Sequence, residues 1–289
     1  MRDKLIFSPW VSLAPALILI VILLGASLAY GIAQSLGLIS VIGQDTLSFA
    51  SYRNLLTGQG MAGREFWGSL AFSLWVSVTS TLVSAVLGLL LAVWLSESKQ
   101  TGGAENLALN WNLAIPHLVW AVALLLLLSQ SGLLARWAAT LGWIQTPADF
   151  PVLVRDRYGI GIILHYISKE IPFLTLILLA VLRRQSAGYR QVAENLGATR
   201  WQQLRFVTLP MVAPSLMSGM LLVFAFIFSS YEVPALLGVN YPRMLPTLAL
   251  RFFNDPDLRA RADGMAISLI ITMIVLVVAV ISLKKGEKI

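Results

Sequence analysis

The chain has 289 residues, of which 57% are hydrophobic and 12% are charged, and its mean hydropathy is +0.79. Because about a quarter of the residues in a soluble globular protein are charged, this composition excludes a soluble globule and predicts an integral membrane protein. The formal net charge of +7 does not indicate nucleic acid as a partner, since the basic residues are scattered over short connectors and form no stripe with interleaved aromatic residues. The absence of cysteine excludes disulfides.

Six apolar runs are long enough to cross a bilayer, which takes about 20 residues of helix. The first follows a basic head, as in a signal peptide, but its apolar run is too long for one and predicts an uncleaved helix. The predicted spans are Trp10–Ile32, Phe66–Leu95, Leu113–Leu134, Ile160–Leu182, Pro214–Leu237 and Gly264–Leu283. We therefore expect an all-α polytopic membrane protein that forms a single domain over residues 1–289.

An even number of spans places both termini on the same side of the membrane. The termini and the connectors 96–112 and 183–210 carry eleven Lys and Arg, against nine in the longer connectors 33–65, 130–158 and 239–263. Cytoplasmic connectors are enriched in Lys and Arg, so we expect the termini and the connector 183–210 in the cytoplasm. The opposite connectors hold Trp137 and Trp143, which are typical of membrane-interface anchors or of a docking surface.

The connector 183–210 continues into a polar segment with the sequence QVAENLGATRWQQLRFVTLP at residues 191–210. A short helix over Tyr189–Leu196 is expected to end at Gly197, which tolerates the backbone conformation of a helix end. Thr199 and Gln202 match the capping box that begins a second helix, and we expect Pro210 to end that helix. This pattern predicts a rigid helix-turn-helix knob outside the bilayer.

This segment resembles the EAA loop of ABC importer membrane subunits, which reads Glu-Ala-Ala, then Leu-Gly-Ala, and about a dozen residues later Leu-Pro. The matching residues are Ala193, Leu196, Gly197, Ala198, Leu209 and Pro210. Gln191 stands where the motif has glutamate and Val192 where it has its first alanine, and Glu194 can substitute from the next turn. In that family the loop seats in a groove of the ATPase subunit, so the resemblance implies an ATPase contact here. The alternative is a plain amphipathic connector.

The resemblance extends over most of the chain from about Tyr52 onward. Residues 156–182 and 209–238 look like the spermidine/putrescine branch of ABC importer permeases, close also to thiamine, iron and sulfate relatives. The resemblance implies a type I importer fold in the bacterial inner membrane and a polyamine or similar solute. It also implies a second permease subunit, identical or different, two ATPase subunits and an external solute-binding protein. ATP and Mg would bind the ATPase subunits. No cofactor or enzymatic activity is expected on this chain.

Two nucleotide-binding patterns bear on that expectation. Gly58, Gly60 and Gly63 spell GxGxxG, but no strand is predicted before them and a membrane span follows, so we do not interpret them as a dinucleotide site. The chain has no GxxxxGK[ST] sequence. ATP hydrolysis would therefore have to come from another chain.

Charged residues near or within the predicted spans are candidates for a substrate path, because a charge at the centre of a bilayer costs about 3 kcal/mol. Lys169 and Glu170 precede Pro172, where a broken helix would let them cap or bridge to a neighbouring span. Glu232 lies beside Tyr231 at one end of the fifth predicted span, an arrangement suited to a cation. The structural alternatives are bridging between helices for the first pair and pairing with an arginine such as Arg243 for Glu232.

The two histidines, His117 and His165, lie on different predicted spans, and we expect hydrogen bonds between helices there rather than a metal site. Small residues are expected at close helix contacts, namely Gly68, Gly88, Gly161, Ser77, Thr79, Ser80, Thr81 and Ser84. Two further function classes remain open. One is an ion-gradient-driven secondary transporter or channel in which the intramembrane charges form a relay, and the other is a non-transporting scaffold.

Overall fold

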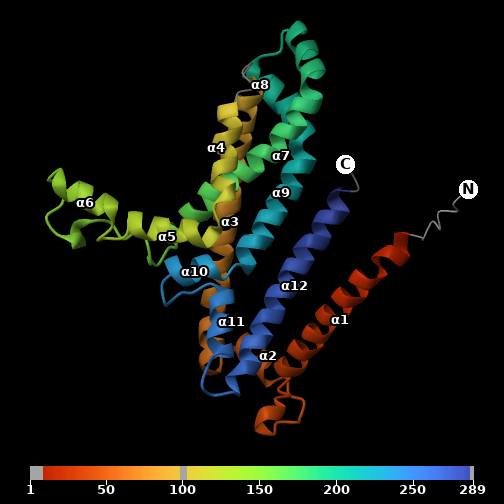
Figure 1. The fold of residues 1–289 in the computed structure, drawn as a ribbon, viewed down its shortest axis with the longest axis vertical. Helices are drawn as coiled ribbons and strands as arrows, with labels where there is room; N and C mark the ends of the chain where they lie inside the picture. Colours follow the sequence, from red (N-terminus) through yellow and green to blue (C-terminus); the bar gives the residue numbers. More distant parts are fainter. Residues whose placement is uncertain (1–8, 98–102, 287–289) are drawn as a thin grey trace, which may run out of the picture. The chain divides into compact units, whose positions relative to one another are not determined.

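The computed structural model describes residues 9–97 and 103–286, and these residues form helices and no β-strand (Figure 1). Six helical stretches are long and apolar enough to cross a membrane: Leu13–Ser35, Gly60–Glu97, His117–Thr140, Ile160–Arg184, Arg200–Ser229 and Ala260–Ile281. The expected all-α fold with six transmembrane helices is thus confirmed for the described residues. The chain divides into two compact units.

Unit 1 comprises the described residues of Met1–Arg64 and Ala249–Ile270. It contains α1 (Pro9–Ser35), the 3-10 turn η1 (Ser40–Ile42), α2 (Ala50–Thr57), the start of α3 (Gly60–Glu97), the end of α11 (Leu245–Phe253) and the first part of α12 (Ala260–Gly286). Tyr52 on α2 donates a hydrogen bond of 2.8 Å to Ser35 Oγ at the end of α1. Gly264 lets α12 approach α11, since a β-carbon there would lie 2.7 Å from the carbonyl oxygen of Ala249.

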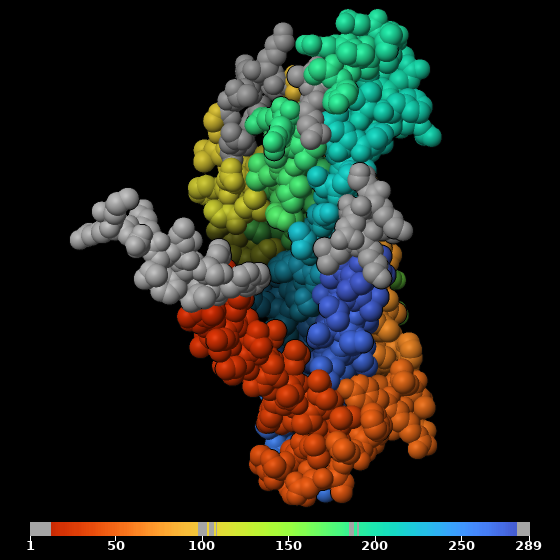
Figure 2. All heavy atoms as spheres, turned by 90° about the vertical axis from the view of Figure 1, so that its right-hand side faces the viewer, coloured from red at the N-terminus to blue at the C-terminus, as the bar shows by residue number. Residues whose placement is uncertain are grey.

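Unit 2 comprises the described residues of Glu65–Leu248 and Ile271–Ile289. Besides the rest of α3, it contains α4 (Gly103–Ala114), α5 (His117–Leu128), α6 (Leu133–Thr140), the 3-10 turn η2 (Pro147–Asp149), α7 (Ile160–Asn195), α8 (Arg200–Gln203), the π-helical turn η3 (Leu204–Thr208), α9 (Leu209–Ser229) and α10 (Glu232–Leu237). α7 is the central helix, because it packs against α4, α5, α9 and α10. The corner between α7 and α8 projects at one end of this unit (Figure 1 and Figure 2).

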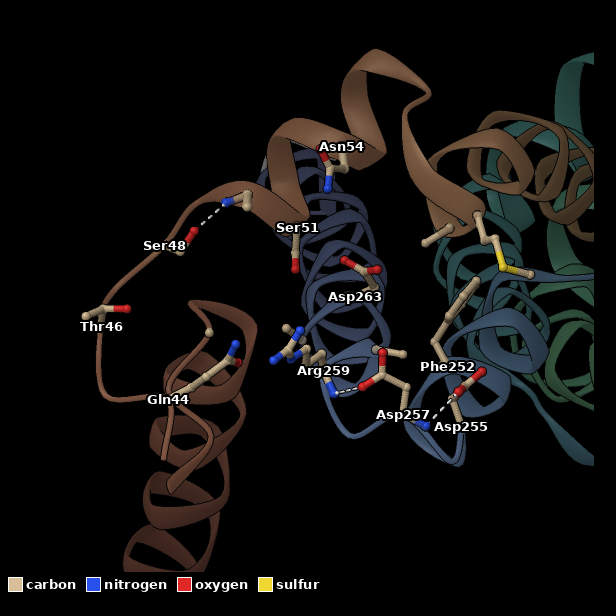
Figure 3. A pocket seen from close by; sticks show the side chains of 16 residues that line it. Gln44, Thr46, Ser48, Ser51, Asn54, Phe252, Asp255, Asp257, Arg259 and Asp263 are labelled. Carbon is tan, nitrogen blue, oxygen red and sulfur yellow. Dashed lines mark hydrogen bonds between the residues drawn. The ribbon is translucent and has the colours of Figure 1, made fainter. Parts of the chain in front are cut away.

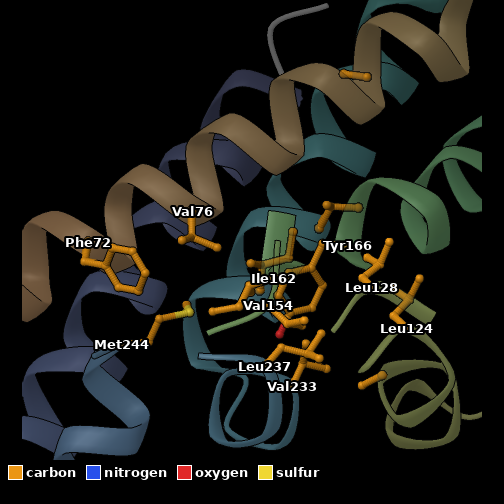
Figure 4. Packing of buried hydrophobic residues seen from close by; sticks show 14 of the residues in the cluster. Phe72, Val76, Leu124, Leu128, Val154, Ile162, Tyr166, Val233, Leu237 and Met244 are labelled. Atoms are coloured by element: carbon orange, nitrogen blue, oxygen red, sulfur yellow. The ribbon is translucent and has the colours of Figure 1, made fainter. Parts of the chain in front are cut away.

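The core of unit 2 gathers buried apolar side chains from α3, α5, α7 and α10 (Figure 4). Two glycines allow close packing around Leu174 of α7. A β-carbon on Gly88 would lie 3.1 Å from Leu174 Cβ, and one on Gly219 of α9 would lie 2.8 Å from Leu174 Cδ2. The expected close contact at Gly88 is therefore confirmed. Thr175 reinforces it by donating a hydrogen bond of 3.3 Å to the Gly88 carbonyl.

Two predicted spans are wrong as continuous helices. The third, Leu113–Leu134, is interrupted where α4 ends at Ala114 and α5 begins at His117, because Pro116 disfavours helical backbone at the residue before it and has no N–H to donate. The fifth, Pro214–Leu237, ends early because α9 stops at Ser229 and Ser230 has extended backbone with ψ of 135°. Apolar residues lie on both sides of each break, so apolar length alone could not locate the breaks.

Proline also acts differently from expectation at two other positions. Pro172 lies inside α7 without breaking it. Pro210 does not end a helix but lies in the first turn of α9, where a missing N–H is tolerated. The expected short helix over Tyr189–Leu196 is likewise the end of the 36-residue α7 rather than a separate element.

Candidate functional site

The knob between α7 and α8 is shaped by a left-handed residue at the end of α7. Gly197 has φ of +77°, its N–H donates to the Glu194 carbonyl at 2.9 Å, and the Ala198 N–H donates to the Ala193 carbonyl at 3.0 Å. This pair of hydrogen bonds is the Schellman motif, which satisfies the last carbonyls of a helix. The small residues Ala193 and Ala198 occupy the two positions whose side chains meet in that motif, and Ala193 is buried.

The predicted capping box is confirmed at the start of α8. The Thr199 N–H donates to Gln202 Oε1 at 2.7 Å, and the Gln202 N–H donates to Thr199 Oγ1 at 3.3 Å. Gln203 adds a side-chain hydrogen bond of 3.0 Å to the Ala198 carbonyl. The turn is therefore fixed from both helix ends. From α8 the chain passes through η3 into α9 without leaving a helical conformation.

Large apolar side chains cover the outside of this knob. Leu196 is 81% exposed, and the other exposed apolar side chains are Tyr189, Val192, Trp201 and Phe206. Gln191 and Glu194 are exposed as well. Such an exposed apolar patch marks a surface that binds another protein or a membrane. We call this surface, formed by the exposed side chains of residues 189–206, the knob surface.

The base of the knob packs within unit 2. A small cavity of about 40 Å³ is lined by the end of α3, by Leu182 within α7, and by α8, η3 and the start of α9. Beneath it, Leu95 of α3, Leu182 of α7 and Val212 of α9 belong to one buried apolar cluster. The knob is thus joined by a packed apolar cluster to three long apolar helices, α3, α7 and α9.

A polar junction joins α7 to the break between α4 and α5. Lys169 Nζ donates hydrogen bonds to the carbonyl oxygens of Asn112 and Ile115, which lie at the C-terminal end of α4. Pro172 has no N–H for the Ser168 carbonyl, and Asn112 Nδ2 donates to that oxygen at 3.1 Å instead. The structural alternative of capping between helices is therefore what the geometry of Lys169 shows.

The two histidines meet beside this junction. His117 Nδ1 lies 3.2 Å from His165 Nε2, so the expected contact between helices is confirmed. Trp120 Nε1 donates to Ser168 Oγ at 2.8 Å. Within the described residues no three His, Asp or Glu side chains gather as a metal site would require.

An open cavity of about 370 Å³ borders the junction, lined by Leu113, His117, Lys169, Glu170, Phe173, Leu222, Val223 and Phe226. The structure brings Lys169 and Glu170 together here with His117, but Glu232 and Tyr231 are not part of the lining. Sequence reasoning missed Phe226 and Leu222. Their spacing of four residues, which places them on one face of α9, was a signal that could have found them.

Glu232 does not lie in the fifth span, contrary to expectation, because it is the first residue of α10. Its side chain and that of Tyr231 are exposed. Arg243, the suggested partner, lies in an ion pair with Glu65 with an N–O distance of 3.5 Å. The GxGxxG residues join α2 to α3, and no strand precedes them in the described chain.

Unit 1 holds an acidic cavity that sequence reasoning did not single out (Figure 3). It measures about 670 Å³, and its lining includes Asp255, Asp257, Asp263 and Arg259. Asp255 Oδ1 accepts the Asp257 N–H at 2.9 Å, and Asp257 Oδ1 accepts the Arg259 N–H at 3.0 Å. These turns hold the carboxylates at the start of α12.

Residues 150–285 match the family model for the binding-protein-dependent transport system inner membrane component. This stretch includes α7, the knob and α9. The matched part of the chain thus has the sequence signature of this family of inner-membrane permeases. The match includes Ala193, Gly197 and Ala198, the residues that build the Schellman turn.

Curated proteins similar to this chain are named as permeases. The inner membrane ABC transporter permease protein YnjC of Escherichia coli is 32% identical over 70% of this chain and 38% of its own length. The trehalose/maltose transport system permease protein MalF of Thermococcus litoralis is 26% identical over 83% of this chain and 80% of its own. The putrescine transport system permease protein PotI of Escherichia coli is 23% identical over 84% and 83%. The chain thus spans well under half the length of YnjC.

Solved structures show the same permease fold. A bacterial ABC transporter involved in import of the acidic polysaccharide alginate matches with a TM-score of 0.78 at 19% identity, covering 97% of this chain and 95% of the other. A structure of the alginate transporter in complex with an alginate pentasaccharide-bound periplasmic protein matches with a TM-score of 0.76, also at 19% identity, over 94% and 91% of the two chains. The fold of this chain is that of an ABC importer permease.

Proposed function

We propose that the chain is the membrane-spanning permease subunit of an ATP-driven ABC importer in the bacterial inner membrane. The observation that carries this proposal is the knob surface, an exposed apolar patch on a turn fixed by the Schellman motif and the capping box. A partner pressing on it moves a rigid joint rather than a flexible loop. Residues Gln191, Glu194, Leu196 and Ala198 are the proposed contacts, with Ala193, Gly197 and Pro210 shaping the surface behind them.

In this proposal, closure of an ATPase dimer displaces the knob and with it α3, α7 and α9. Packed interfaces move as rigid bodies between discrete arrangements, so displacement at the knob changes the access to the bundle. Two ATPase subunits would bind ATP and Mg, and this chain would hydrolyse none. A second permease subunit, the same chain or another, would complete the translocation path. The knob and both termini would then lie in the cytoplasm.

The proposed external partner is a solute-binding protein. The transporter structure with a bound periplasmic protein supports this class of partner. The connector 239–263 is expected on the external side of the membrane, so the acidic cavity of unit 1, whose aspartates lie in that connector, would be outside. Its carboxylates Asp255, Asp257 and Asp263 would favour a basic docking segment over an acidic one, because complementary charge steers association.

The proposed solute is a polyamine or a similar small cation. Supporting it are the buried carboxylate of Glu170, the exposed carboxylate of Glu232 beside the Tyr231 ring, and the similarity to the putrescine permease. The named solutes of other similar permeases include trehalose, maltose and sulfate, so the similarity alone does not select among them.

The test of this function compares two leucines. Leu196 on the knob is 81% exposed, and Leu141 after α6 is 62% exposed. We expect Leu196→Glu to reduce the ATPase activity recovered with the tagged chain from native membranes by about tenfold, because a desolvated carboxylate in an apolar interface lacks a partner. Leu141→Glu should leave it unchanged. Equal ATPase recovery in both variants, or uptake driven by an ion gradient without ATP, would contradict the proposal.

A further inference from the structure

The open cavity beside the polar junction has the size of a small-solute site. Its volume of about 370 Å³ falls within the range of about 300 to 1,000 Å³ found for ligand pockets. Most of its wall is apolar and comes from α4, α7 and α9. Three titratable side chains line it, namely His117, Lys169 and Glu170.

Lys169 is already engaged. Its ammonium group donates to two carbonyl oxygens at the C-terminal end of α4, where the helix dipole adds partial negative charge. The positive charge of Lys169 is thus matched by the end of α4. Lys169 is held against the backbone. It therefore shapes the wall of the cavity and does not offer a charge for a solute to pair with.

Glu170 has no comparable hydrogen bonds among the described residues, although the charge of Lys169 also acts on its carboxylate. Its side chain is 6% exposed, it lines the cavity, and within the described residues its carboxylate receives no hydrogen bond and forms no ion pair. A buried carboxylate without a donor is costly. A ligand that supplies N–H donors and a positive charge would remove that cost through charge-assisted hydrogen bonds.

Aromatic rings line the same cavity as this carboxylate. Phe226 is 43% exposed, and its ring centroid lies 4.9 Å from that of His117. Phe173 lines the same space. Because His117 uses Nδ1 toward His165, its Nε2 is the ring nitrogen that remains for a solute. Aromatic faces attract cations and also pack against methylene groups.

We propose that this cavity binds a small organic cation, with Glu170 accepting hydrogen bonds from its ammonium group and Phe226 contacting its apolar part. The proposal rests on the importer function above and names a solute site within it. A neutral polyol would add no positive charge beside Glu170 to that of Lys169, which is already bound to the end of α4. An anion would be repelled by Glu170 and would have to displace Lys169 from the carbonyl oxygens that it caps.

The experiment measures equilibrium binding to the complete transporter in lipid nanodiscs, without solute-binding protein or nucleotide. The probe is radiolabelled 1,4-diaminobutane, and the competitors are 1,4-butanediol and succinate, which share its four-carbon chain. We expect saturable diamine binding that neither competitor displaces. Glu170→Gln should weaken it about 10-fold to 100-fold, as expected for a lost hydrogen bond to a charged group.

Two further variants keep the test decisive. Phe226→Leu retains the carboxylate and should weaken diamine binding about threefold or more through the lost ring, so it decides the outcome if Glu170→Gln does not assemble. Asp45→Asn removes an exposed carboxylate outside the cavity and should leave affinity unchanged.

Unchanged affinity in the Glu170 and Phe226 variants, or competition by the diol or succinate as strong as by unlabelled diamine, would overturn the cation site. ATP hydrolysis is measured on the same samples, and the Leu196→Glu variant shows how much of it depends on the knob. If it persists while diamine binding is absent, only the cation site fails. If hydrolysis is absent as well, the importer function fails with it.

Discussion

The backbone angle at Gly197 sets the shape of the knob. A β-carbon there would meet nothing within 4 Å, so space is not the constraint, but the φ of +77° lies in the left-handed region. An L-residue with a side chain pays about 1–2 kcal/mol to adopt that region. Glycine at position 197 therefore has a conformational reason rather than a packing reason.

This reasoning predicts different outcomes for two substitutions at Gly197. Gly197→Ala should destabilise the turn by about 1–2 kcal/mol, whereas Gly197→Asn should be milder because asparagine tolerates left-handed backbone. The measurement is hydrogen exchange of residues 196–203, together with the ATPase recovered with the chain. If alanine protects these amides as well as glycine does, the Schellman turn does not control the knob.

At the scale of the element, proline shows how far sequence could predict the fold. The capping box at Thr199 and the helix end at Gly197 were predicted correctly because both depend on neighbouring residues. Three prolines gave three different results. Pro116 separates two helices, Pro172 is accommodated because the Asn112 side chain takes the freed carbonyl, and Pro210 begins α9. Pro172 is tolerated because a hydrogen-bond donor from another helix is present, and no local sequence pattern reveals that donor.

The knob and the cavity also differ in how far the sequence could predict them. The knob residues were found from sequence because the knob is a contiguous segment. The cavity was found only in part, since it is assembled from the break after α4, the middle of α7 and one face of α9. Lys169 and Glu170 were found by their cost in an apolar span. Phe226 was missed because its spacing from Leu222 places both on one face of α9 but does not show that this face lines the cavity.

The separate helix α10 gives a prediction for the entry of solute. Glu232 begins α10 beyond the end of α9, and its exposed carboxylate would attract a cation before it reaches the cavity. We expect Glu232→Gln to lower uptake of labelled putrescine about threefold, at saturating solute-binding protein, because one attractive charge is lost. Basal ATP hydrolysis and assembly should persist. Loss of assembly to the same extent would instead identify Glu232 as a structural residue, and unchanged uptake would remove it from the path.

At the scale of the whole molecule, the account requires the knob surface to face an ATPase in the cytoplasm. The chain has no cysteine, so one introduced thiol provides a unique chemical probe on this chain. Leu196→Cys places it on the knob surface and Leu141→Cys places it on the connector after α6. The two positions lie on opposite sides of the membrane in the proposed topology.

The most direct test is thiol cross-linking of these two variants in native membranes, followed by identification of the joined partner, with a membrane-impermeant maleimide applied to intact cells in parallel. The account predicts that Cys at position 196 cross-links to an ATP-binding subunit and is protected from the maleimide, whereas Cys at position 141 is labelled and joins no ATPase. Labelling of position 196 from outside the cell, or cross-linking of the ATPase to position 141 instead, would contradict it.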